Sequence, residues 1–291
     1  MGTIKKTEKL EHLSIVEIKG DDSAEFLQGQ MTQDIYSIED SKASVTSILN
    51  PQGRMISTAF VFKWGESFLL ILNNEVRDKL IAWLSRFILR SEVEITKSED
   101  SVFGLNQENA KKLCSVLNLE AKDIGSESDE SCLKTIETDD KRAFLVCKSE
   151  NFLDDLSISS LSTKDWKMAD INAGIPTIYR ENIEKFIPQM VNLDLINGIS
   201  FSKGCYTGQE IVARVQHKGT VKQRMFHITG RASNKKIDPG TTILFEDTKV
   251  GTVIESVEND GQMHALGVIN NDASTKKLVV DGIGIKLTLE G

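Results

Sequence analysis

The sequence predicts an α+β protein that ends in a small antiparallel β-barrel, and three observations support this fold class. Two strand-like runs flank a proline-glycine turn at residues 50–53, and an amphipathic helix pattern covers residues 75–90. After Gly219, short β-branched runs alternate with turn clusters. The chain has 291 residues, of which 40% are hydrophobic, so it can bury a sizeable core divided between two or three lobes.

The first elements alternate between strand and helix. Apolar residues alternate loosely over residues 13–19 and predict a strand, after which the stretch DSAEFLQGQ predicts a short helix. Asp22 is a suitable N-cap for this helix, and Gly29 stands where a glycine often ends one. The runs ASVTSIL and MISTAFVF flank NPQG at residues 50–53, with proline and glycine where a type I turn favours them. These runs predict a hairpin, and SFLLIL adds a third antiparallel strand.

The middle of the chain carries the clearest helix. Apolar residues recur there at helical spacing: Val76, Leu80, Ile81, Leu84, Phe87 and Ile88. A further helix is expected over residues 106–117 and a strand at RAFLVC, separated by an acidic, exposed loop at residues 123–131. In the C-terminal part, the runs TTILF, VGTVIES and KLVV alternate with Asp-Pro-Gly, Asn-Asp-Gly and Asp-Gly turns, which is typical of a small barrel.

Composition narrows the functional classes. The net charge of −8 argues against direct binding to nucleic acid or to an anionic membrane surface. No segment approaches the roughly 18 unbroken apolar residues of a membrane span, and the N-terminal residues lack the apolar core of a signal peptide, so we expect a cytoplasmic protein. The scattered cysteines favour reduced thiols over a disulfide framework or a metal site: Cys114, Cys132, Cys147 and Cys205.

The stretch KGCYTGQE, residues 203–210, combines features of a helix start. Thr207 and Glu210 have the spacing of a capping box and precede an apolar run, so a helix is expected to begin at Thr207 and to end at Gly219. Glu210 and Arg214 are four residues apart, in the order that favours an ion pair on one helix face.

Cys205 lies just before this predicted helix. Unpaired backbone N–H groups at the helix start and the neighbouring Lys203 both favour a thiolate. Gly204 and Gly208 let a ligand or another chain approach the backbone closely. The same residues also fit a purely structural role, in which the glycines form a tight turn and Cys205 is a small buried hydrophobic residue. The residues alone leave both interpretations open.

Several stretches resemble a known family in the same order along the chain. The run KGCYTGQEIVAR is similar to the signature of the YgfZ family of folate-binding proteins, which are relatives of the glycine-cleavage aminomethyltransferase, or T-protein. The stretches GDDSAEFLQGQMTQD, LNPQGRM, INAGIPTI and FIPQMVNLDLINGISFSKGC agree with it. The resemblance covers residues 13–225, and the predicted barrel fits the family's C-terminal domain.

The resemblance implies a fold of two α+β lobes plus the barrel, around a central hole in which a tetrahydrofolate lies. The expected lobes are residues 1–45 with 165–221, and residues 46–164; the barrel is expected at 222–291. The resemblance also implies a role in assembling or repairing iron-sulfur proteins. These iron-sulfur proteins include enzymes that thiolate tRNA, so the implied link to tRNA modification is indirect. An indirect role fits a negatively charged chain better than direct binding of tRNA does.

The folate-linked residues of the family can be carried over one by one. Trp166 matches a tryptophan whose indole can stack on a pterin or benzoyl ring, although a core position is the alternative. Leu13 stands where the family has a second tryptophan, and Asn172 where T-protein-like chains hold the pterin with a glutamate, so both imply weaker recognition. The signature residues are expected to shape the surroundings of Cys205: Lys203, Gly204, Tyr206, Thr207, Gly208, Gln209, Glu210 and Arg214.

Two alternative functions stay open. A folate-dependent aminomethyl or other one-carbon transferase would need the aspartate pair of T-protein, but Ser57 and Thr58 stand in its place, and a hydroxyl does not replace a carboxylate. This substitution disfavours an enzyme. A thiol module could instead use Cys205 as a transient cluster ligand or redox group, with help from a partner.

The remaining polar residues give weaker indications. The four histidines are too scattered in the sequence to suggest a catalytic pair, and we expect them to be surface residues or to be satisfied within the fold: His12, His217, His227 and His264. A modest basic group is expected to be solvated surface, or else to meet the glutamate tail of folate or a partner: Lys218, Lys222, Arg224 and Arg231.

Overall fold

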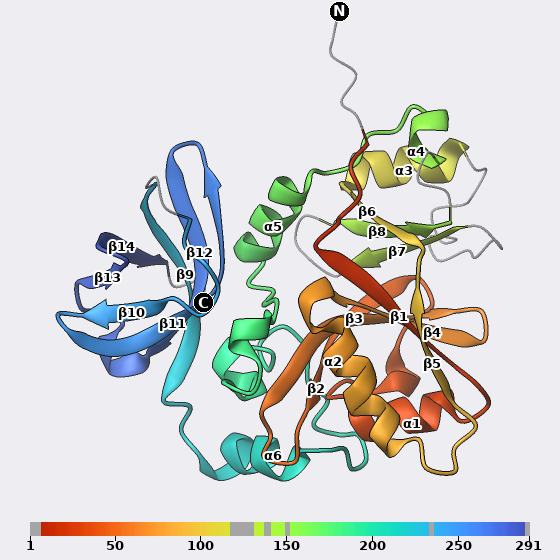
Figure 1. Cartoon of the computed structure of the whole chain (residues 1–291), viewed down its shortest axis with the longest axis horizontal. Helices are drawn as coiled ribbons and strands as arrows, with labels where there is room; N and C mark the ends of the chain where they lie inside the picture. Colours follow the sequence, from red (N-terminus) through yellow and green to blue (C-terminus); the bar gives the residue numbers. More distant parts are fainter. Residues whose placement is uncertain (1–6, 117–130, 137–140, 149–151, 233–235, 289–291) are drawn as a thin grey trace, which may run out of the picture. The chain divides into compact units, whose positions relative to one another are not determined.

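The computed structural model describes residues 7–116, 131–136, 141–148, 152–232 and 236–288 (Figure 1). The chain divides into two compact units. The first unit contains residues 1–29, 34–45 and 59–166, and the second contains residues 30–33, 46–58 and 167–291. The predicted α+β fold class is confirmed. The predicted lobe boundaries stay a prediction.

Within the described residues, eight strands form one mixed sheet in the order β5-β1-β4-β3-β2-β7-β8-β6. The meander predicted from three consecutive runs is confirmed as β2, β3 and β4. The pairing of β2 with β7 is parallel, whereas β1 pairs antiparallel with both of its neighbours. The strand bounds are β1 (Leu13–Lys19), β2 (Lys42–Leu49), β3 (Met55–Trp64), β4 (Ser67–Asn73), β5 (Glu94–Ser98), β6 (Ser101–Leu105), β7 (Ser131–Ile136) and β8 (Ala143–Cys147).

The turn between β2 and β3 forms as the sequence predicts. The Gly53 N–H donates to the Asn50 carbonyl at 2.9 Å, which closes the turn. The Asn50 side-chain oxygen accepts the N–H groups of Gln52 at 3.0 Å and Arg54 at 2.9 Å. Asparagine thus fixes the turn from within, a use of its short side chain that is common in loops.

Four of the described helices, α1, α2, α3 and α6, follow the predicted positions with changes at their ends. The helix bounds are α1 (Ser23–Gln30), α2 (Asn74–Leu84), α3 (Gln107–Val116), α4 (Phe152–Asp155), α5 (Thr163–Asn172) and α6 (Gln209–Lys218). The expected stop at Gly29 is wrong because α1 continues through it. The carboxylate of Asp22 accepts the Glu92 N–H at 2.8 Å, so a tertiary contact uses the predicted cap. Helix α2 is shorter than its apolar pattern, which continues into a 3-10 turn at Ser85–Phe87.

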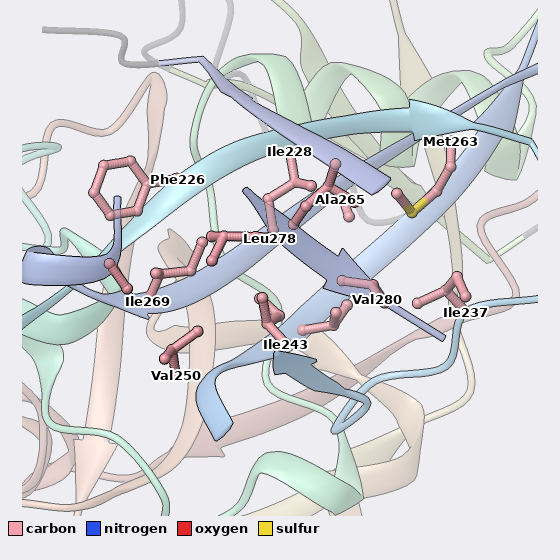
Figure 2. Close-up of a cluster of buried hydrophobic side chains, with 13 residues drawn as sticks. Phe226, Ile228, Ile237, Ile243, Val250, Met263, Ala265, Ile269, Leu278 and Val280 are labelled. Atoms are coloured by element: carbon pink, nitrogen blue, oxygen red, sulfur yellow. The ribbon is translucent and has the colours of Figure 1, made fainter. Parts of the chain in front are cut away.

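The C-terminal barrel is confirmed as a closed antiparallel barrel with strand order β10-β11-β12-β9-β14-β13. Its strands are β9 (Gln223–Arg231), β10 (Thr242–Phe245), β11 (Thr248–Asn259), β12 (Gln262–Asn270), β13 (Leu278–Val280) and β14 (Ile283–Thr288). Figure 2 shows how side chains such as Ile228, Ile243 and Val280 point toward one another inside it. Alternation along each strand fills this interior, because successive side chains point to opposite faces.

Part of one prediction lies outside the described residues, namely the acidic loop up to residue 130. No helix in the described part of the chain is long and apolar enough to cross a membrane. The described residues also contain no group of three or more histidine, cysteine, aspartate or glutamate side chains that could hold a metal ion.

Candidate functional site

Lys203 connects the signature KGCYTGQE to the stretch around Met31 and Gln33, inside the second unit. It is only 8% exposed, and its ammonium donates hydrogen bonds to the carbonyls of Met31 at 2.8 Å and Gln33 at 2.7 Å. A buried ammonium needs such acceptors because removing it from water is costly. Lys203 therefore ties the start of the signature to the stretch GQMTQD.

Two glycines let the signature pack directly against the turn at residues 50–53. Gly208 has φ +83° and Gly53 has φ +69°, which is left-handed backbone. A Cβ atom on Gly208 would lie 2.6 Å from the Asn50 carbonyl oxygen, and one on Gly53 would lie 2.8 Å from the Cβ of Ile211. Three stretches far apart in the sequence thus meet at one place in the second unit.

Helix α6 begins at Gln209, not at Thr207. Gly208 is its N-cap, and no side chain caps the helix there. The Thr207 hydroxyl instead lies 3.4 Å from the side-chain oxygen of Gln30. The predicted capping box is wrong because close packing on the turn requires glycine at the cap position. The predicted end is confirmed, since the Gly219 N–H bonds to the Val215 carbonyl at 3.2 Å.

Cys205 is exposed on this junction. Cys114 and Cys147, by contrast, are buried, and burial raises the pKa of the Cys147 thiol to about 12. The interpretation of Cys205 as a small buried hydrophobic residue is therefore wrong. A thiol must reach solvent and its partners to react, and Cys205 meets that condition. Its thiolate form stays a prediction.

The other signature residues surround Cys205 with a mixture of buried and exposed groups. Tyr206 is buried beneath the signature, with the Lys203 ammonium 5.1 Å from its ring centre, and burial raises the pKa of its phenol to about 12. The Gln209 amide donates to the Gly204 carbonyl at 3.3 Å. The predicted pair on α6 is confirmed: Arg214 bonds to Glu210 at 2.6 Å, with both side chains largely exposed.

Trp166 lies entirely in the core of the first unit, with 0% exposure. The Arg142 guanidinium sits 4.5 Å from its ring centre and the Phe144 ring 4.6 Å away. The backbone of Gly104 is so close that an added Cβ would lie 2.2 Å from the indole. Stacking on a pterin therefore requires one of these neighbours to move. The folate contact stays a prediction, and the alternative core role is the one that the contacts favour.

The other two predicted folate residues lie on different elements. Leu13 is half-buried at the start of β1 in the first unit, where it pairs with Asn73. Asn172 is the exposed last residue of α5 and belongs to the second unit. A site that uses both of them together with Trp166 also stays a prediction.

The second unit contains a cavity of about 690 Å³. It lies between the end of α5, the segment after residue 191 and the barrel strands β9 and β12. Leu195, 66% exposed, stands at the cavity. The lining combines apolar and polar side chains: Ile171, Ala173, Asn192, Leu195, Ile196, Arg224, Met225, Phe226, His227, Leu266, Asn271 and Ser274, with Gly174. Sequence reasoning missed this site, because its residues come from four separate segments.

Of the predicted basic group, the structure describes the side chains of Lys222, Arg224 and Arg231. Arg224 makes a bidentate ion pair with Asp194, at 2.6 and 2.9 Å, and donates to the Gln189 carbonyl at 2.8 Å. Lys222 is exposed just before β9 and Arg231 is the exposed last residue of β9, about 30 Å away along an extended strand. Arg224 therefore holds the cavity wall, whereas Lys222 and Arg231 are solvated, in agreement with the expectation of a solvated surface.

Two of the scattered histidines are brought together by the barrel. His227 on β9 and His264 on β12 have their Nε2 and Nδ1 atoms 3.3 Å apart, within hydrogen-bonding distance. The strands pair directly, so the separation of 37 positions between the two histidines in the sequence says nothing about their distance in space. His227 also lines the cavity. This contact agrees with the expectation that the histidines are satisfied within the fold or lie at the surface.

Ser57 and Thr58 lie buried on β3. The Ser57 hydroxyl donates to the Thr58 carbonyl at 2.7 Å, and the Thr58 hydroxyl accepts the Ile178 N–H at 3.1 Å. Both hydroxyls thus serve the local fold. They do not provide a carboxylate that could orient or deprotonate an amine.

Comparison with known proteins agrees with this architecture. Residues 9–111 match the model of the GCVT N-terminal domain family. The chain is 30% identical to the tRNA-modifying protein YgfZ of Cronobacter sakazakii, covering 92% of this chain and 86% of that protein. It is 29% identical to the protein of the same name from Pectobacterium atrosepticum, over 97% of this chain and 89% of that one.

A solved structure has the same fold. The glycine cleavage system aminomethyltransferase T from Bartonella henselae matches with a TM-score of 0.76 over 99% of this chain and 87% of that chain. The two sequences are 13% identical, so the likeness concerns the fold. The predicted relationship to the aminomethyltransferase fold is confirmed.

Proposed function

This chain belongs to the YgfZ family of tRNA-modifying proteins, and we propose that it is a cytoplasmic, folate-binding accessory factor for the assembly or repair of iron-sulfur proteins. Its clients in this proposal include enzymes that thiolate tRNA, so it supports tRNA modification without binding the nucleic acid. The observation that carries folate binding is the cavity of about 690 Å³ in the second unit.

The cavity residues fit a folate in size and in chemistry. Sites for organic cofactors typically enclose about 300–1,000 Å³ and combine apolar walls with a few polar groups. Phe226 and Leu266 offer apolar surface to a flat ring, and the polar side chains of Asn271 and Ser274 line the same cavity. His264 contacts His227 and so orients its imidazole. A bound tetrahydrofolate supplies one-carbon or reducing chemistry, and these residues would bind and orient it.

Filling the cavity should abolish folate binding. Ala173→Phe places a large ring on the α5 side of the cavity, and we expect the affinity for tetrahydrofolate, measured by calorimetric titration, to fall at least tenfold, about 1.4 kcal/mol. Ala82→Phe, on the exposed side of α2, makes the same chemical change elsewhere and should leave the affinity unchanged. Equal affinity in all three proteins would place the folate outside this cavity.

The transferase alternative gains no support from the buried strand β3. Aminomethyl transfer needs a general base or a carboxylate near the reacting amine, and the hydroxyls of Ser57 and Thr58 are both bonded to backbone groups. Turnover of a one-carbon donor by the purified protein would nevertheless favour the transferase.

A thiol module is the second candidate, and the exposure of Cys205 favours it. A single cysteine cannot hold an iron-sulfur cluster by itself, so in this alternative Cys205 is a transient ligand for a cluster that a partner also binds, the cluster being cargo. The junction of Lys203, Gly208 and the turn at 50–53 gives the thiol a fixed base. This candidate is compatible with folate binding.

Replacing Cys205 by serine tests the thiol. We expect Cys205→Ser to restore the activity of an iron-sulfur enzyme much less than the wild-type chain does in cells that depend on it, because serine is a poor ligand for iron and is redox inactive. Ser202→Ala, at an exposed neighbour, should restore activity fully. Equal restoration by Cys205→Ser and wild type would remove the thiol from the mechanism and leave the folate proposal standing.

A further inference from the structure

A cluster of three side chains, two of them buried and one partly buried, connects α5 to the barrel. Lys167 on α5 donates to the Tyr179 hydroxyl at 2.6 Å and lies 3.2 Å from the Glu255 carboxylate on β11. The Tyr179 hydroxyl donates in turn to the same Glu255 oxygen. The three groups thus contact one another in every pairing, and all of them belong to the second unit.

The burial of this cluster makes each contact matter. Glu255 is 1% exposed and Tyr179 5%, whereas the Lys167 side chain is 19% exposed. Burial raises the pKa of Glu255, while the charge of Lys167 and the hydrogen bond from Tyr179 act in the opposite direction. A hydrogen bond from the Thr177 side chain acts in the same direction as Lys167 and Tyr179, so a carboxylate in this position depends on these partners, since an unpaired buried charge is strongly unfavourable. The barrel thus holds Lys167 through the Glu255 carboxylate, which is buried and therefore has few other groups to bond to.

The cluster lies one helical turn from the cavity wall. Ile171 follows Lys167 by four residues, which puts both on the same face of α5. Ile171 lines the cavity opposite barrel residues Phe226 and Leu266. The segment around Tyr179 is bound to β11 as well, because the Asn182 amide contacts the carbonyls of Val253 at 3.4 Å and Ile254 at 3.2 Å. The distance between the end of α5 and the barrel is therefore fixed at Lys167.

We propose that Glu255 is a positioning residue for the ligand cavity: through Lys167 and Tyr179 it holds the end of α5 against the barrel and so sets the width of the cavity. This inference rests on the proposed folate binding for its effect on affinity. The claim that Glu255 holds the end of α5 against the barrel does not depend on folate and can be tested without any ligand. Glu255 does not line the cavity, and it acts through α5.

Glu255→Gln is the sharpest test because glutamine keeps the volume and can still accept the Tyr179 hydrogen bond. It removes the negative charge that attracts Lys167 and replaces one acceptor oxygen by an amide N–H donor group. We expect the affinity for tetrahydrofolate to fall by about 3- to 30-fold, the range seen when residues remote from a ligand couple to its site. Glu258→Gln makes the same change at an exposed position of β11 and should leave the affinity as in wild type.

Hydrogen exchange followed by mass spectrometry gives a readout that is independent of the ligand. In Glu255→Gln the amides of residues 167–175 should exchange faster than in wild type, while those of β12 keep their protection. Glu258→Gln should change neither. Tyr179→Phe, which removes only the hydroxyl, should accelerate the same amides of α5 and serves in place of Glu255→Gln if that variant does not fold.

The outcomes separate the two proposals. If wild type binds no tetrahydrofolate but Glu255→Gln still accelerates exchange in α5, folate binding is wrong and the positioning role stands. If amide hydrogen exchange in α5 is unchanged in both Glu255→Gln and Tyr179→Phe, the positioning role is overturned, whatever the affinities for tetrahydrofolate are. In a double-mutant cycle on affinity, Lys167→Met and Glu255→Gln should be non-additive, and strict additivity would also contradict the proposal.

Discussion

Trp166→Ala is expected to lower the free energy of unfolding by about 3–5 kcal/mol, the usual cost of truncating a fully buried tryptophan. The indole fills the space between Phe144 and the backbone of Gly104, and its loss leaves a cavity that these neighbours close only in part. It also removes the ring that faces the Arg142 guanidinium at 4.5 Å, a contact that is stronger away from water. Urea unfolding followed by circular dichroism measures the loss without relying on tryptophan fluorescence.

This expected instability changes how the folate role of Trp166 must be tested. Loss of tetrahydrofolate binding in Trp166→Ala would follow from unfolding as readily as from a lost stacking contact. Trp166→Phe keeps an aromatic ring in the core and should cost less. Trp83→Ala is the matched control, because Trp83 is half-buried on α2 and packs on Phe87 and Arg86. Wild-type stability in Trp166→Ala would contradict the core placement of the ring.

The fold could be predicted wherever local chemistry decides it. The turn at residues 50–53 follows from asparagine, proline and glycine acting within four residues, and the barrel follows from alternating runs between turn clusters. The end of α6 at Gly219 is of the same kind. Each of these features depends on near neighbours in the sequence, so no tertiary contact was needed to infer it.

The candidate site was harder to predict because tertiary contacts decide it. Thr207 has the sequence of an N-cap, yet the cap is Gly208, since only glycine tolerates the approach of the Asn50 carbonyl. Arg224 reads as a free basic residue until Asp194 is seen beside it. Glu255 lies in an ordinary strand pattern, and nothing local distinguishes it from the exposed Glu258. The roles of Gly208, Arg224 and Glu255 all depend on partners far away in the sequence, which a single sequence does not reveal.

Gly208→Ala is expected to be the other strongly destabilising substitution, and it acts at the signature itself. A residue with a Cβ in left-handed backbone costs roughly 1–2 kcal/mol, and overpacking against fixed neighbours adds roughly 1–3 kcal/mol. Here the added atom would lie 2.6 Å from the Asn50 carbonyl oxygen and 3.1 Å from the Cα of Gly53, both backbone atoms that cannot rotate away. We therefore expect a loss of about 2–5 kcal/mol in the free energy of unfolding.

The same signature supplies the control. Gly204 has φ outside the left-handed region and open space where a Cβ would be placed, so Gly204→Ala should change the free energy of unfolding by less than about 1 kcal/mol. The two substitutions make the same chemical change and differ in the backbone conformation and in the packing that they disturb. If Gly208→Ala proves as stable as Gly204→Ala in urea, the contact between the signature and the turn at residues 50–53 is not tight. Cys205 would then lack the rigid base on which a thiol acting at a fixed position depends.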